Sequence, residues 1–67
     1  MVRVIRNLST GEYLTKGEWT PNYDDAQKFE GTADVVRVCL ALALRDVEMV
    51  MTFDAERPEL HIPIPNP

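Results

Sequence analysis

The chain has 67 residues, which is enough for one domain and too short for two. Its 7 basic and 11 acidic residues give a net charge of −4, so we expect no binding to nucleic acid and no attraction to anionic membranes. Cys39 is the only cysteine, and no apolar stretch approaches the roughly 18 residues of a membrane span. These features favour a cytoplasmic protein without disulfides.

The first expected element is a β-hairpin. Residues 1–6 are β-branched and basic, and residues 12–15 are a second short strand-like run. Asn7 and Gly11 lie between them and favour a turn, because Gly adopts positive φ and Asn bonds to nearby backbone. Residues 16–18 predict a further turn.

A short helix of about two turns is expected next, over residues 22–29. Asn22 is a suitable N-cap, and Asp24 and Asp25 follow in the first turn, where the positive end of the helix dipole favours acids. Gly31 ends this helix.

A longer helix is expected over residues 33–45, with Thr32 as its N-cap. Residues placed at about 100° intervals form one broad apolar side that we expect to face the sheet. That side consists of Val35, Val36, Cys39, Leu40, Leu42 and Ala43. Because Val38, Ala41 and Leu44 fall in or beside the polar stripe, the helix has more apolar surface than one sheet is expected to cover.

Residues 47–53 predict the third strand, because apolar and polar side chains alternate along them. The odd-numbered residues should lie beneath the long helix. The opposite face of the strand is half polar and includes Glu48 and Val50.

The last ten residues, 58–67, form a Pro-rich tail after a single α+β domain at residues 1–57. Ile62 and Ile64 share one parity, and Pro63 and Pro65 share the other, so the missing N–H groups would all lie along one edge. This pattern fits a protected edge strand, and a loose extended tail is the alternative. The expected fold is therefore ββααβ with a possible C-terminal edge strand, in a largely antiparallel sheet with the long helix on one face.

Chemistry-bearing residues are few, and we expect no enzyme activity, no cofactor and no metal. Cys39 lies on the side of the helix expected to be buried, whereas the only histidine, His61, lies in the tail as a solvated residue. The pair Asp24 and Asp25 is explained by helix capping, and one His with one Cys cannot assemble a metal site at workable spacing.

Several pieces of the first half share an arrangement with known sequences. These are the run from Val4 to Asn7, Gly11-Glu12-Tyr13-Leu14, Trp19-Thr20, and Ala26-Gln27-Lys28-Phe29 before the long helix. In this order they resemble short uncharacterised bacterial and phage-encoded single-domain proteins. The resemblance implies a small hairpin-plus-helix fold and no particular activity.

The leading functional hypothesis is a non-catalytic protein-interaction module that self-associates or binds an unknown protein partner. Its expected surface consists of Val38, Ala41, Leu44 and Val50. In the alternative, the tail covers these residues in a monomer. A second hypothesis is a small-molecule or peptide-binding protein with an aromatic cleft formed by Tyr13, Trp19 and Tyr23. A third is an acidic inhibitor of a basic partner.

Overall fold

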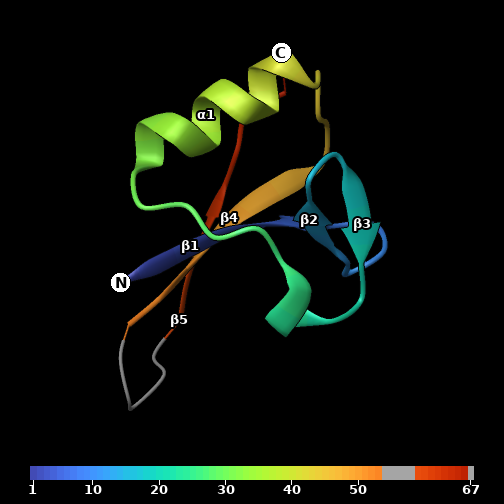
Figure 1. The fold of residues 1–67 in the computed structure, drawn as a ribbon. Coiled ribbons are helices and arrows are strands. Elements are labelled where there is room, and N and C mark those ends of the chain that lie inside the picture. Colours follow the sequence, from blue (N-terminus) through green and yellow to red (C-terminus); the bar gives the residue numbers. More distant parts are fainter. Residues whose placement is uncertain (54–58, 67) are drawn as a thin grey trace.

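The computed structural model describes residues 1–53 and 59–66, which form a five-stranded antiparallel sheet with one α-helix on one face (Figure 1). The elements are β1 (Val2–Asn7), β2 (Tyr13–Thr15), β3 (Glu18–Thr20), the 3₁₀ turn η1 (Tyr23–Asp25), α1 (Thr32–Ala41), β4 (Val47–Thr52) and β5 (Glu59–Pro63). The strand order is β3-β2-β1-β4-β5. The α+β class and the antiparallel sheet are confirmed, whereas the ββααβ arrangement with two helices is wrong.

The expected short helix is reduced to the single turn η1. Asn22 caps it as expected, because its side-chain oxygen accepts a hydrogen bond from Asp24 N at 3.0 Å. Ala26 then adopts an extended conformation, with φ −66° and ψ 144°. Phe29 and Arg3 of β1 exchange two backbone hydrogen bonds, of 2.8 and 3.2 Å. The segment after η1 thus pairs with the sheet, and this pairing replaces the second turn of helix.

The turn expected at residues 16–18 is a tight hairpin turn of two residues, and Glu18 already begins β3, which the sequence analysis did not predict as a strand. Lys16 and Gly17 both have positive φ, of 51° and 83°. Such a two-residue loop is typical of a type I′ turn, whose twist matches that of paired strands. Trp19 lies opposite Leu14 in this hairpin and packs on the helix side of the sheet.

The helix α1 begins one residue earlier than expected. Its N-cap is Gly31, with no side-chain capping bond, and Thr32 is its first helical residue. The Thr32 hydroxyl accepts a hydrogen bond from Arg3 Nε at 3.2 Å. Thr32 therefore connects the helix to β1 and does not cap it.

The helix also ends at Ala41, short of the expected Arg45. Ala43 has a left-handed backbone conformation, with φ 51°, and its N–H donates to Leu40 O at 3.2 Å. Leu44 N donates to Cys39 O at 2.9 Å, which completes the pair of bonds of a Schellman motif. The sequence gives no glycine at this position, so the usual signal for a helix end is missing.

The strand β5 confirms the expected edge strand. It pairs antiparallel with β4, and just beyond it Ile64 N donates to Val47 O at 3.1 Å. Backbone N–H groups alternate in direction along a strand, so the N–H groups that Pro63 and Pro65 lack would have pointed toward the free edge. A loose tail is therefore wrong for this segment. The domain boundary expected after residue 57 lies outside the described residues.

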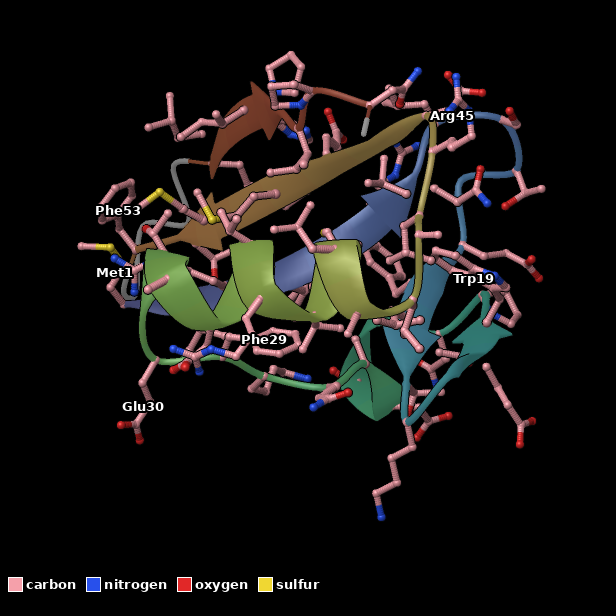
Figure 2. The ribbon with its side chains drawn as sticks, turned by 90° about the horizontal axis from the view of Figure 1, so that it is seen from above. Met1, Trp19, Phe29, Glu30, Arg45 and Phe53 are labelled. Atoms are coloured by element: carbon pink, nitrogen blue, oxygen red, sulfur yellow. The ribbon has the colours of Figure 1, made fainter. Side chains whose placement is uncertain are left out.

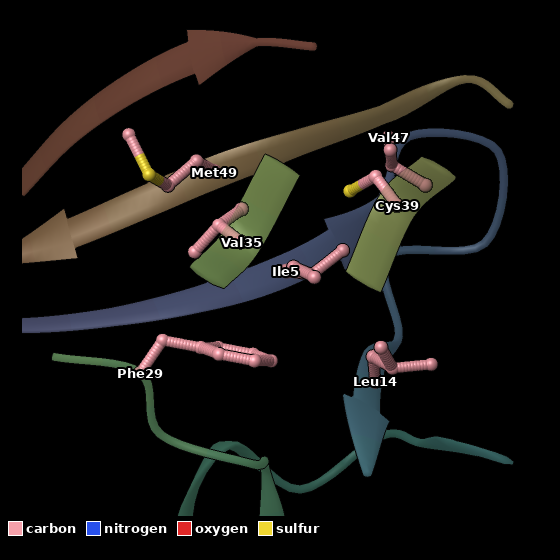
Figure 3. Close-up of a cluster of buried hydrophobic side chains, with 7 residues drawn as sticks. All are labelled: Ile5, Leu14, Phe29, Val35, Cys39, Val47 and Met49. Carbon is pink, nitrogen blue, oxygen red and sulfur yellow. The ribbon is translucent and has the colours of Figure 1, made fainter. Parts of the chain in front are cut away.

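Both faces of the sheet carry a hydrophobic cluster. On the helix side the buried residues are Ile5, Leu14, Phe29, Val35, Cys39, Val47 and Met49 (Figure 3). On the opposite side Ala26, which follows η1, packs against Val4 and Val50. Figure 1 shows α1 and η1 on opposite sides of the sheet. The long helix accordingly covers one face, and the segment around η1 covers part of the other.

Candidate functional site

A hollow of the described surface lies between α1 and the segment that follows β5. It is a cavity of about 270 Å³ lined by Val36, Cys39, Leu40, Leu44, Ile64, Pro65 and Asn66. The lining is apolar apart from Asn66, whose side-chain oxygen accepts a hydrogen bond from Asp46 N at 3.0 Å. We call this cavity the α1–β5 groove.

Exposed apolar side chains extend the groove over the neighbouring strand. Leu60 and Ile62 lie opposite Met51 and Met49 of β4, so they project from the helix side of the sheet. Both are exposed, and so is Leu40, with 63% of its surface accessible. Figure 2, viewed from above α1, shows β5 beside the helix and not beneath it. We call the groove together with the exposed Val36, Leu40, Leu60 and Ile62 the α1–β5 face.

Of the four residues expected to form the interaction surface, Leu44 lines the groove, and the other three do not. Val38 and Leu44 are half-buried and pack against the helix-side cluster, and Val50 is buried beneath the segment around η1. Of the four, Ala41 is exposed. The expected orientation of the helix is therefore only partly correct. Apolar residues surround most of α1, so the pattern alone does not determine which of them face the core.

Several residues assigned to the core side of the helix are correspondingly exposed. These residues are Val36, Leu40, Leu42 and Ala43. Val35 and Cys39 are buried as expected. The early helix end contributes to the difference, because Leu42 is the C-cap and Ala43 lies beyond the last helical turn.

The three residues of the expected aromatic cleft do not line one cleft. Tyr13 and Tyr23 stack edge to face, with ring centroids 5.4 Å apart, on the side of the sheet opposite α1. Trp19 packs against the cluster on the helix side. The cause is the pleat, since Tyr13 pairs with Thr20 in the hairpin and Trp19 with the next residue, so the two rings project from opposite faces.

A polar cluster lies on the face opposite the helix and was not predicted. The Glu48 side chain is 8% exposed and has two basic partners. Arg6 Nη1 donates to Glu48 Oε2 at 3.1 Å, and His61 Nδ1 lies 2.8 Å from the same oxygen. His61 Nε2 lies 3.0 Å from Glu59 Oε1. Hydrogen bonds to Glu48 and then to Glu59 raise the pKa of His61 above its usual value.

His61 is exposed to solvent, as the sequence analysis expected, but it lies in the paired strand β5 and not in a loose tail. It lies opposite Val50 in the pairing of β4 with β5, on the other side of the sheet from Cys39. Burial raises the pKa of the Cys39 thiol, which disfavours the nucleophilic thiolate. The alternation of residues 47–53 predicted that Glu48 points away from the helix-side core. The pairing register of β4 with β5 places His61 beside Glu48, and no local sequence pattern predicts that register.

Within residues 1–53 and 59–66, no group of three or more His, Cys, Asp or Glu side chains is arranged to hold a metal ion. In the same part of the chain, α1 is too short and no other helix is long and apolar enough to cross a membrane. No family model, curated protein or solved structure matches the sequence or the fold. The resemblance to bacterial and phage-encoded proteins therefore stays a prediction.

Proposed function

We propose that the protein is a non-catalytic interaction module that binds another protein surface through the α1–β5 face. The observation that carries this proposal is the apolar groove of about 270 Å³ with exposed Leu40, Leu60 and Ile62 around it. Contiguous apolar surface of this kind marks interaction sites in soluble proteins, because leaving it in water is unfavourable.

The chemistry of the groove favours a protein partner with apolar side chains. Its one polar side chain, Asn66, already accepts a backbone hydrogen bond, so little is left to orient a polar metabolite. The groove also lacks the basic residues that phosphate recognition needs. A hydrophobic interface core without charged groups is what protein–protein contacts commonly contain.

The placement of the reactive side chains supports a role without catalysis. Cys39 of α1 carries the thiol and packs against the helix side of the sheet, whereas His61 carries the imidazole and projects from the opposite face. The imidazole nitrogens of His61 lie within hydrogen-bond distance of two carboxylates. No nucleophile with an adjacent base is assembled by these contacts.

Affinity capture with variants tests the proposal. The tagged protein, its Leu40→Glu variant and its Leu42→Glu variant would each be incubated with lysate of cells that also produce the untagged chain. Leu42 is the matched control, because it is an exposed leucine at the same helix end and does not line the groove. We expect the Leu40→Glu variant to lose the partner protein that the unchanged chain captures, and the Leu42→Glu variant to retain it. Equal capture by both variants would contradict the proposal.

A further inference from the structure

We infer that the partner is a second copy of this chain, with the two copies related by a two-fold axis and α1 of each lying over β5 of the other. This deepens the proposed function and rests on it, since it names the occupant of the α1–β5 face. Such a contact is isologous, which means that both copies use the same surface. That surface must therefore contain both the side chain that inserts and the groove that receives it.

The first observation is an incomplete layer. α1 contacts β1, and it leaves β5 uncovered on the same side of the sheet (Figure 2). Leu60 and Ile62 are therefore exposed although they project from the face that carries the core. A second helix beside α1 would cover them, as helices usually cover such a face.

The second observation is that α1 has the outer surface such a helix needs. Ala33, Val36 and Leu40 are all exposed and are spaced by three and then four residues. This spacing forms a narrow apolar stripe that is typical of helices that pair with another apolar surface. Val36 and Leu40 of this stripe line the groove, so the helix surface that inserts and the groove that receives it lie side by side on one copy.

The third observation concerns size. Leu40 is the most exposed large apolar residue among those described, and it borders a cavity of about 270 Å³. A cavity of about 150 Å³ accommodates benzene, so the groove has room for a leucine side chain. Leu40 of one copy entering the groove of the other gives a reciprocal knob-into-hole contact.

The fourth observation is charge. The segment 32–46 contains two acidic residues, Asp34 and Asp46, and two basic residues, Arg37 and Arg45, so its net charge is zero. The remaining residues carry the −4 of the chain. Two copies of an acidic protein would repel each other over most surfaces, and the contact at α1 avoids this repulsion.

The size of the protein sets the share of its surface that a stable dimer would bury. A stable interface buries about 800 Å² on each partner, which is close to a fifth of the 4379 Å² accessible surface. Association also supplies stability that a 67-residue core lacks.

Sedimentation equilibrium from micromolar to millimolar concentration tests the inference on the purified chain. We expect a reversible dimer. Leu40→Glu should raise its dissociation constant by at least about thirtyfold, because it places an unpaired charge in the contact. Leu42→Glu should change the dissociation constant by less than about threefold, and circular dichroism should confirm that both variants are folded. A monomer at every concentration, or a dimer insensitive to Leu40→Glu, would overturn the inference.

Disulfide trapping gives a second test that does not depend on a charged variant. One sample carries Leu40→Cys and a differently tagged sample carries Ile62→Cys, and the two are mixed under mild oxidation. We expect a mixed cross-linked pair, with no comparable product when Leu42→Cys replaces Leu40→Cys. Equal cross-linking from both positions would exclude the reciprocal geometry. If the purified chain stays monomeric while lysate capture still depends on Leu40, the second copy is excluded and the proposed function stands.

Discussion

Glu48 is the one charged residue that is buried among those the structure describes. It lies in β4 and interacts with Arg6 of β1 and His61 of β5, so a single carboxylate connects three adjacent strands. Burying a carboxylate is costly unless it is paired and hydrogen-bonded, and both conditions are met here. We therefore interpret Glu48 as the residue that fixes the edge strand against the centre of the sheet.

Removing this carboxylate should destabilise the fold. Glu48→Ala leaves Arg6 Nη1 and His61 Nδ1 without their shared acceptor, and we expect a loss of about 1–3 kcal/mol in the free energy of unfolding. Urea denaturation measures it. Glu59→Ala is the control, because Glu59 is an exposed partner of the same imidazole and should cost under about 1 kcal/mol. Equal losses would show that burial of Glu48 is unimportant.

The stability of the protein should depend on pH through His61. Its neighbours are Glu48 on β4 and Glu59 on β5, with Arg6 behind Glu48, and the two carboxylates raise the pKa of the imidazole. A raised pKa in the folded state means that protonation stabilises the fold. This stabilisation is complete at pH values below the pKa of His61 in the unfolded chain, about 6.5. It is lost as the pH rises through the higher pKa of His61 in the folded protein.

Thermal unfolding of the protein and of His61→Gln across this pH range measures the effect. We expect the difference in melting temperature between the two proteins to shrink as pH rises above neutrality. A difference that stays constant or grows with pH would contradict the assignment. Because the imidazole is partly exposed, the effect should be modest and should weaken in high salt.

At the scale of elements, the C-terminus of α1 contains a residue in an unfavourable conformation. Ala43 has φ 51°, a region that costs a residue with a Cβ about 1–2 kcal/mol. Ala43→Gly should therefore raise the free energy of unfolding by about 1 kcal/mol. Ala41→Gly, within the helix, should lower it by a similar amount. Chemical denaturation of both variants measures whether the two changes in the free energy of unfolding have opposite signs. Destabilisation by both substitutions would contradict the assignment of a Schellman motif.

The free edge of β5 makes a separate prediction. Pro63 offers no N–H there, so Pro63→Thr adds a donor to an unpaired edge and should increase aggregation. Light scattering over time measures this increase. Glu59→Thr introduces the same residue at the same parity, where an N–H is already present, and should aggregate less despite losing a charge. If Pro63→Thr is as soluble as the unchanged protein, the prolines do not protect this edge.

Sequence patterns predicted the elements that depend on local signals. Alternation identified β4, and the parity of Pro63 and Pro65 identified β5. The expected short helix over residues 22–29 was wrong because the sheet pairing of Phe29 outweighs the capping signal at Asn22. The exposed side of α1 and the partner of Glu48 were missed for a shared reason, since both depend on how distant segments pack and not on periodicity.

At the scale of the whole molecule, the two faces of the sheet differ in how they are completed. The face that carries Val4 and Val50 is covered in part by the segment around η1, and a satisfied polar cluster lies beside them. The helix side has a larger core and an uncovered apolar margin at Leu60 and Ile62. We therefore propose that the protein acts by binding another protein through this apolar margin and does not catalyse a reaction.

Amide chemical shifts of the isotope-labelled protein, recorded as a function of its concentration, test this account most directly. We expect concentration-dependent shifts confined to residues 33–40 of α1 and 60–64 around β5, with the β2–β3 hairpin unchanged. Spectra that are independent of concentration, or that change mainly at the hairpin or around Tyr23, would contradict the assignment of the α1–β5 face as the site of self-association.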